Sequence, residues 1–480
     1  MEDTGVDLVN NWLYYSFYII YIITILSTVV VVISENRNPV KTIAWVVVLL
    51  FLPIIGIVFY FFFGQDFTKY RMISRKSLKK LIQQSEYTDL TNNKQEIPPR
   101  ALQLINLNYT TNSSPFYANN AITIFTNGKE KFDRLKLELS AAKKYIHIQY
   151  YIFENDKLGN EICDILIDKA NKGVEVRLIY DDVGCWRVDK AFFERLTRAG
   201  IIVRPFMEVT FPRLANKINY RNHRKIVVID GTTGFTGGMN IADRYIEGLP
   251  WGKWRDTHIM IKGPGVHGLQ SSFSVDWYFT EKQLLSQDKY YPTVDPCGEV
   301  GLQIVTAGPI GTWKEIALGI FRAIANAQKY VYIQTPYFLP TESLTTALQM
   351  AALSKVDVRI MLPAQSDSTV LYRGTCSYIT PMLKAGVKIY FYEPGFLHAK
   401  TVVIDDYFST IGSTNLDFRS FEHNFEVNSF MYNENLAIEI KNIFLSDQKQ
   451  CRRVTMRTWK RRPWQHKVAE SVIRLLSPLL

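Results

Sequence analysis

The chain has 480 residues, of which 47% are apolar, 13% aromatic and 21% charged. This composition excludes disordered, collagen-like and coiled-coil proteins, and the length suggests about three domains. The net charge of +11 favours an anionic partner, either nucleic acid or an anionic lipid surface. The five cysteines are widely spaced and form no C-x-x-C pair, which argues against a disulfide scaffold and a thiolate zinc site.

Two long uncharged stretches open the chain, at residues 12–33 and 43–63. Each is long enough to cross a bilayer as a helix, and the acidic residues before the first stretch argue against a cleaved signal peptide. We therefore expect a transmembrane hairpin over residues 1–65. A pair of buried core helices is the alternative.

A polar segment follows at residues 66–115, and six basic residues lie at its start, within 67–82. We interpret this segment as a membrane-proximal linker. The loop between the two spans carries fewer basic residues, and basic residues near span ends stay inside. The sequence therefore predicts a multi-pass protein of the cell membrane, with both termini and the later domains in the cytoplasm.

From residue 116 onward the sequence repeats itself. The matching segments are 144–149 with 329–334, 173–178 with 355–360, and 223–230 with 398–405. Within each copy, short β-branched runs alternate with amphipathic segments, which is typical of an α/β domain. We expect two tandem domains, residues 116–295 and 296–450, each with a mixed sheet flanked by helices. The first copy has about ten extra residues within 207–222.

Two of the seven histidines begin the same pattern at equivalent points of the duplication. The two motifs are His223-x-Lys225-x4-Asp230 and His398-x-Lys400-x4-Asp405. In a strand, positions i and i+2 share a face, so each histidine and its lysine point the same way. Each aspartate lies at the expected strand end, where it is either a turn residue or a direct participant in the chemistry.

Four further polar residues align between the repeats. Asn240 and Asn415 end small-residue segments, and each either donates to phosphate oxygens or caps a helix. Asp256 and Glu426 lie on apolar strands, and each either orients the partner histidine through a ring nitrogen or makes an ordinary salt bridge.

Paired histidines and lysines predict a site for a phosphoryl group. A metal is disfavoured because a lysine two residues from each histidine would repel a cation, and no cofactor is expected. One histidine would attack phosphorus and form a phospho-histidine, while the other would act as general acid and then base. The lysines and asparagines would stabilise charge on the non-bridging oxygens.

The duplicated motif resembles that of the phospholipase D superfamily, and the whole chain is similar to the bacterial cardiolipin synthases. Segments 38–45, 52–56, 150–153 and 474–480 carry this second resemblance. The resemblance implies phosphatidyl transfer between two phosphatidylglycerols, giving cardiolipin and glycerol, with His223 as nucleophile and His398 as acid and base. A phospholipase D-type hydrolase, a membrane-tethered nuclease and a non-enzymatic lipid-binding protein are the alternatives.

Residues 451–480 form a basic tail followed by an apolar stripe. The tail suits an interfacial helix on an anionic leaflet, or a helix packed on its own domain. Of the net charge of +11, residues 66–82 carry +5 and residues 452–467 carry +7, which leaves −1 for the rest. We therefore expect phosphatidylglycerol and anionic membrane lipid as partners, and no nucleic acid; the oligomeric state is not readable from the sequence.

Overall fold

The computed structural model describes residues 3–34, 39–52, 56, 60, 72–85, 97–209 and 219–475. The chain divides into two compact units. The smaller comprises Met1–Asp66 with Val209–Asn219, and the larger comprises Phe67–Glu208 with Tyr220–Leu480.

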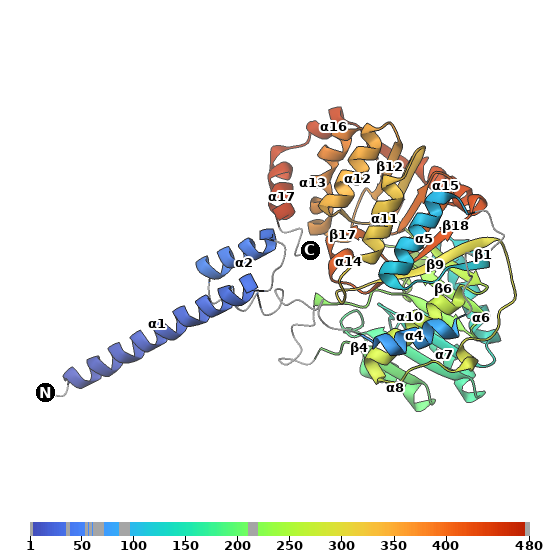
Figure 1. Ribbon diagram of the computed structural model, residues 1–480, viewed down its shortest axis with the longest axis horizontal. Coiled ribbons are helices and arrows are strands. Elements are labelled where there is room, and N and C mark those ends of the chain that lie inside the picture. Colours follow the sequence, from blue (N-terminus) through green and yellow to red (C-terminus); the bar gives the residue numbers. More distant parts are fainter. Residues whose placement is uncertain are drawn as a thin grey trace. The chain divides into compact units, whose positions relative to one another are not determined.

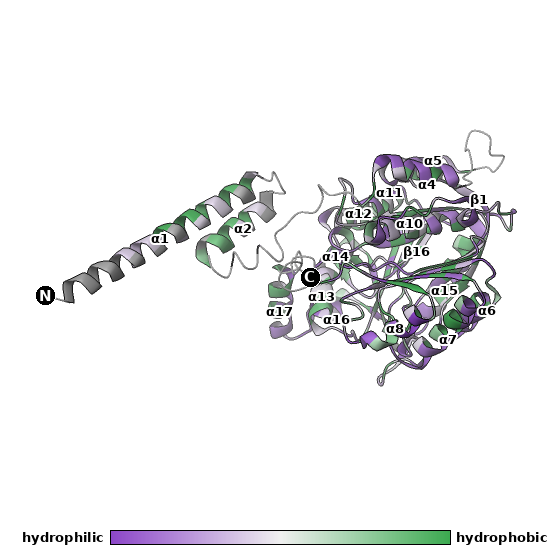
Figure 2. Cartoon of the chain, turned by 90° about the horizontal axis from the view of Figure 1, so that it is seen from below, coloured by the Kyte–Doolittle hydropathy of each residue, from purple (hydrophilic) through white to green (hydrophobic). Residues whose placement is uncertain are grey.

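The smaller unit contains helices α1 (Asp3–Ser34) and α2 (Pro39–Phe51), which contact each other. Many of their described residues are apolar (Figure 2). The predicted span 12–33 lies within α1, whereas much of the predicted span 43–63 lies outside the described residues. Within the described residues, no helix combines the length and the apolar character needed to cross a membrane.

The larger unit is built on one mixed sheet of fifteen strands, joined at its middle by antiparallel pairing of β1 and β9 (Figure 1). Outward from the join, the first repeat contributes β1 (Tyr117–Phe125), β8 (His258–Lys262), β6 (Thr233–Gly237), β5 (Ile226–Ile229), β2 (Tyr145–Tyr150), β3 (Glu175–Asp181) and β4 (Ile202–Phe206). The second contributes β9 (Val300–Ala307), β18 (Glu426–Tyr432), β16 (Phe408–Gly412), β15 (Thr401–Ile404), β10 (Tyr330–Gln334), β12 (Asp357–Pro363), β13 (Lys388–Tyr392) and the edge strand β19 (Cys451–Val454).

The first seven strands of each half follow the same order, as the duplication in the sequence predicts. Three neighbouring strands of each repeat, β2–β3–β4 and β10–β12–β13, are parallel, and the remaining pairs of this sheet, including β13 with the edge strand β19, are antiparallel. The sequence predicted a separate sheet for each repeat. The structure instead joins them, because β1 and β9 pair edge to edge and so remove two exposed sheet edges.

Three cores hold this unit together. One lies under α6 (Gly128–Ala141), α7 (Lys157–Asn171) and α8 (Lys190–Arg198) of the first repeat. Another lies under α11 (Glu315–Ala325), α12 (Glu342–Leu353) and α13 (Thr369–Ala385) of the second. The third is shared, because it combines strand residues of both repeats with α10 (Val266–Glu281) and α15 (Glu434–Gln448). Burial on both faces explains the near-continuous apolar strands.

The predicted linker at residues 66–115 is wrong where it covers α5 (Pro99–Asn112), which packs against β9 and α11. The buried Asn108 donates to Gln303 Oε1 at 3.1 Å, and Asn112 donates to the Thr306 carbonyl at 2.8 Å. Its polar side chains are thus partners for β9, which a reading of composition alone cannot reveal. The preceding helix α4 (Arg75–Gln84) also buries Leu81 fully.

Candidate active site

The two motif histidines lie just before equivalent strands. His223 precedes β5, which pairs with the carboxyl end of β2, and His398 precedes β15, which pairs with the carboxyl end of β10. Each is tied to the other repeat through the backbone. The amide of His223 donates to the Phe425 carbonyl at 2.9 Å, and the amide of His398 donates to the Arg255 carbonyl at 2.7 Å.

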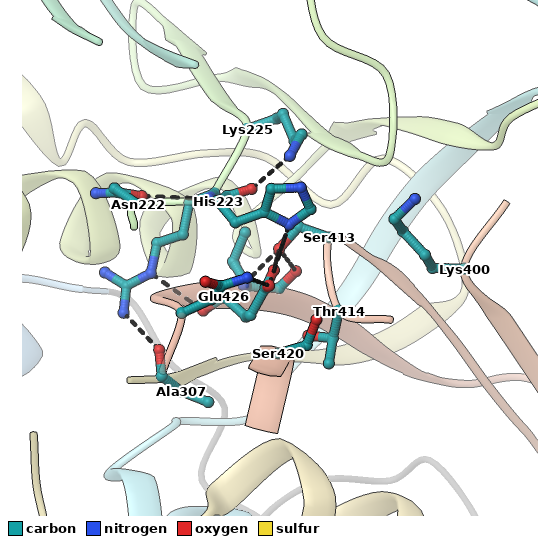
Figure 3. A network of polar contacts seen from close by, with 12 residues as sticks. Asn222, His223, Lys225, Ala307, Lys400, Ser413, Thr414, Ser420 and Glu426 are labelled. Carbon is teal, nitrogen blue, oxygen red and sulfur yellow. Dashed lines mark hydrogen bonds and ion pairs between the residues drawn. The ribbon is translucent and has the colours of Figure 1, made fainter. Parts of the chain in front are cut away.

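A carboxylate of the opposite repeat holds each histidine ring. His223 Nδ1 lies 3.0 and 3.1 Å from the two carboxylate oxygens of Glu426, as Figure 3 shows. His398 Nδ1 lies 2.6 Å from Asp256 Oδ2. In this arrangement Nδ1 donates its proton to the carboxylate and the lone pair of Nε2 is left for chemistry. Asp256 and Glu426 thus each contact the histidine of the opposite repeat, in two pairs that cross between the repeats.

The two orienting carboxylates have different surroundings. Ser413 donates a short hydrogen bond to Glu426, and Asn424 donates another at 3.1 Å. Asp256 instead accepts from the Thr257 amide at 2.7 Å. Gly238, which aligns with Ser413, lies so close to Asp256 that any side chain there would overlap its carboxylate. The sequence marks Gly238 and Ser413 as members of small-residue segments, but only the structure shows that both lie against the carboxylates.

Burial governs the protonation of both histidines. It lowers the pKa of His398 to about 4, helped by Lys400 and opposed by Asp256. Burial also lowers the pKa of His223, and there Glu426 opposes the shift. Burial would raise the pKa of the two carboxyl groups, but it is outweighed: Lys400 and His398 lower the pKa of Asp256, and His223 lowers that of Glu426. Both rings are therefore neutral in the free site at pH 7, with their carboxylates ionised.

Each motif lysine is buried and bonded to its own histidine. Lys225 Nζ donates to the His223 carbonyl, and Lys400 Nζ donates to the His398 carbonyl, both at 2.6 Å. Burial lowers the pKa of Lys225 to about 7 and that of Lys400 to about 8. Two buried ammonium groups repel each other. An anion between them would relieve this repulsion, so it would raise the pKa of both lysines and would itself be bound tightly.

Aromatic rings border both histidines. Tyr151 lies edge-on to His223 with ring centroids 5.0 Å apart, and Trp254 lies 5.1 Å from His398. These two rings were not among the predicted site residues. Their positions in the sequence could have indicated them. Trp254 lies two residues before Asp256, and Tyr151 lies directly after the buried strand β2.

The two asparagines are placed differently. Asn240 is already engaged, since its amide donates to the Tyr245 hydroxyl at 2.6 Å and its oxygen accepts from the Ile152 amide at 3.2 Å. The side-chain oxygen of Asn415 is buried and has no hydrogen-bond partner among the described residues. This unused atom of Asn415 is an acceptor, so binding to a phosphate oxygen would have to use the amide nitrogen of the same side chain.

The motif aspartates lie at the opposite end of their strands from the histidines. Asp405 accepts hydrogen bonds from the backbone amides of Gln328, Lys329 and Tyr330 at 2.7–2.8 Å, and Arg100 donates to it at 2.9 Å. Asp230 accepts equivalent bonds from the backbone amides at residues 143–145. Six residues lie between each histidine and its aspartate, and four of them form the strand, so the two side chains are separated by roughly 20 Å. The turn-residue alternative therefore fits the structure, and a place among the reacting groups does not.

Replacing Asp405 with alanine should destabilise the protein without removing its chemistry. Three backbone amides, one of them in the buried residue Tyr330, and Arg100 would lose their acceptor, which should lower the free energy of unfolding by about 2–4 kcal/mol. Denaturant unfolding followed by tryptophan fluorescence would measure this. Asp168→Ala is the matched control, because its exposed pair with Lys172 contributes less than ~0.5 kcal/mol. A stable but inactive Asp405→Ala variant would contradict the structural role.

No group of three or more His, Cys, Asp or Glu side chains in the described part of the chain is arranged to hold a metal ion. The site thus consists of two neutral imidazoles, two carboxylates that orient them and two lysines, contributed equally by the repeats. This set can support nucleophilic attack by one ring, proton transfer by the other and stabilisation of a phosphoryl group.

Duplicated H-x-K-x4-D motifs with crossed histidine–carboxylate pairs, on one duplicated α/β fold, define a phospholipase D-like enzyme. The family model described as cardiolipin synthase, PLD-like domain, matches residues 135–277 and 320–448. The model of the phospholipase D-nuclease N-terminal region matches residues 19–65. The chain belongs to the cardiolipin synthase family.

Curated relatives match nearly the whole chain. The major cardiolipin synthase ClsA of Bacillus subtilis (strain 168) is 39% identical over 471 residues, covering 96% of this chain and 98% of its own. The cardiolipin synthase of Geobacillus sp. (strain WCH70) is 41% identical over 452 residues, covering 93% and 90%. Among solved structures, the phosphatidylserine synthase of Haemophilus influenzae Rd KW20 shares the fold, with a TM-score of 0.59 and 15% identity over 79% of this chain and 100% of that one.

Proposed function

We propose that the protein transfers a phosphatidyl group from one phosphatidylglycerol to another, giving cardiolipin and free glycerol. The observation that carries this proposal is the pair of crossed histidine–carboxylate contacts, His223 with Glu426 and His398 with Asp256. They occur in a chain that aligns with cardiolipin synthases over almost its full length. The side chains of the site suffice for the reaction without a cofactor.

In the first step, Nε2 of His223 attacks the phosphorus of the first phosphatidylglycerol. The bond from phosphorus to the glycerol head-group oxygen breaks, and His398 gives that oxygen its proton. The products of the step are free glycerol and a phosphatidyl group on His223. Glu426 keeps the Nδ1 proton of His223 in place, which directs the free lone pair to Nε2 and stabilises the charge that develops on the ring.

In the second step, His398 removes a proton from the terminal hydroxyl of a second phosphatidylglycerol. The resulting oxygen attacks phosphorus, the bond from phosphorus to Nε2 breaks, and cardiolipin leaves.

His398 is neutral in the free site, because burial and Lys400 lower its pKa to about 4. Binding of the anionic phosphodiester beside it favours the imidazolium that the first step needs.

Lys225, Lys400 and the side-chain amide nitrogen of Asn415 would donate to the non-bridging oxygens of the phosphoryl group. The lysines are buried, so their attraction for an oxygen anion is little screened by water. Asn240 would act indirectly, by positioning Tyr245: it bonds to the Tyr245 hydroxyl, and the Tyr245 ring lies 6.2 Å from that of His398.

We also propose that the N-terminal region holds the enzyme in the cell membrane as a hairpin over residues 12–33 and 43–63, with the catalytic repeats in the cytoplasm. The match of residues 19–65 to the N-terminal family model supports this, as do the apolar helices α1 and α2. The six basic residues within 67–82 support the orientation.

Product analysis tests this function. Purified full-length protein would be incubated with phosphatidylglycerol labelled separately in its head group and its acyl chains. We expect one glycerol released for each cardiolipin formed, because each transfer expels one head group. Phosphatidic acid and glycerol without cardiolipin would show a hydrolase and overturn the proposal. Vesicles of phosphatidylcholine alone serve as the control and should yield neither product.

A further inference from the structure

The last described helix, α17 (Trp464–Leu475), exposes a row of large apolar side chains. Trp464, Val468, Val472 and Leu475 are 68%, 51%, 54% and 81% exposed. At 100° per residue they fall within about 80° of the helix surface. Four exposed large apolar residues on one face are unusual for a surface that meets only water. We call these four residues the α17 stripe.

The other face of α17 is anchored to the second repeat. Glu470 is buried and forms a two-bond ion pair with Arg462, at 2.5 and 3.0 Å. Ile473 lies against Gly374 of α13, and the Arg474 guanidinium lies over the ring of Tyr378, 4.6 Å from its centroid. The helix is thus held with its stripe facing away from the domain. The contacts with α13 agree with the second of the two alternatives for the tail, a helix packed on its own domain, and the opposite face of that helix is exposed.

Exposed basic residues lie close to the α17 stripe in sequence. Besides Arg474, they are Arg457, Lys460, Arg461 and Lys467. None of these four makes an ion pair with an acidic side chain in the described ranges, although such pairs occur elsewhere on the surface. An apolar row with unpaired basic residues beside it complements an anionic lipid surface, where acyl chains receive the apolar groups and lipid phosphates the cations.

We propose that the α17 stripe docks onto the surface of an anionic bilayer and so holds the second repeat, which carries His398, against the lipid. This inference rests on the proposed function, because the substrate is a lipid of that same surface. Apolar burial supplies the insertion and the basic residues supply selectivity for anionic lipid. The contact is separate from the N-terminal hairpin, which lies in the other unit.

A local probe on α17 tests this docking in the full-length protein. Bulk vesicle binding is uninformative, because the proposed hairpin binds lipid independently. An environment-sensitive fluorophore would be attached to Val472→Cys in a Cys297→Ser background, since Cys297 is the one fully exposed cysteine among those described. In vesicles containing phosphatidylglycerol we expect a blue-shifted emission, and quenching by brominated lipid about threefold stronger than in phosphatidylcholine vesicles.

Leu137→Cys provides the matched control, because Leu137 is 67% exposed on α6 and lies in the other repeat. Combined charge reversal at Lys460, Arg461 and Lys467 should reduce quenching at position 472 to the level of the control. Equal quenching at 137 and 472 would overturn the docking, as would cross-linking of position 472 to a second copy. Cardiolipin formation, assayed on the same samples, reports separately on the proposed function.

Discussion

Replacing His223 with alanine is expected to reduce cardiolipin formation by at least about 10⁴-fold, because the covalent intermediate can no longer form. No neighbouring group can take over: Glu426 faces Nδ1 of the missing ring, and Lys225 is bonded to the backbone carbonyl. The measurement is the initial rate with labelled phosphatidylglycerol in mixed micelles.

Trapping the intermediate distinguishes the two histidines. Rapid alkaline quenching preserves a phosphorus–nitrogen bond, and mass spectrometry of peptides would locate the phosphatidyl group. We expect it on His223 in the wild type, and again on His223 in His398→Gln, where the loss of the acid and base slows both its formation and its breakdown. A phosphatidyl group on His398 would reverse the two roles. His466→Ala, an exposed histidine on α17, is the control and should retain full activity.

Replacing Glu426 with glutamine should lower kcat about 10²–10⁴-fold and leave KM nearly unchanged. The amide cannot balance the positive charge that develops on His223, and its NH2 group can donate to Nδ1, which favours the tautomer with the proton on Nε2. Ser413 and Asn424 both donate to Glu426, so the neutral side chain would also offer one acceptor fewer to two buried donors. Initial rates at varied phosphatidylglycerol give kcat and KM separately.

Because Glu426 contacts the histidine of the other repeat, a double variant tests whether His223 and Glu426 act together. In the double variant His223→Ala with Glu426→Gln, activity should be no lower than with His223→Ala alone, because the two residues act as a unit. Additive losses would contradict the pairing. Glu434→Gln is the matched control, since it makes the same chemical change at an exposed position at the start of α15. Asp256→Asn should behave as Glu426→Gln does, acting through His398.

Short-range patterns in the sequence pointed to the residues that the structure brings together in the candidate site. The spacing His223-x-Lys225 and its copy at His398 places residues on one face of an extended segment, which depends only on local geometry. The alternation of apolar runs with amphipathic segments predicted the α/β class, and the duplication predicted equivalent strand orders in the two repeats.

Contacts between distant segments could not be predicted in this way. The polar composition of residues 66–115 suggested a linker, yet α5 lies within this segment and its Asn108 and Asn112 bond to β9. The aspartates of the motifs had two interpretations, and the choice depended on which backbone amides lie beside them. The joining of two sheets into one likewise rests on a single strand pair, β1 with β9.

The sequence by itself determined the fold class, the two histidine–lysine pairs and the residue types for phosphoryl transfer, because local spacing and composition set these. Only the tertiary structure decided that each ring is held by the carboxylate of the other repeat, that Asp230 and Asp405 brace strand ends, and that the α17 stripe faces outward. The physical reason is that hydrogen bonds and burial depend on which segments meet in space, and residues some 200 positions apart, such as His223 and Glu426, carry no local sign of that meeting.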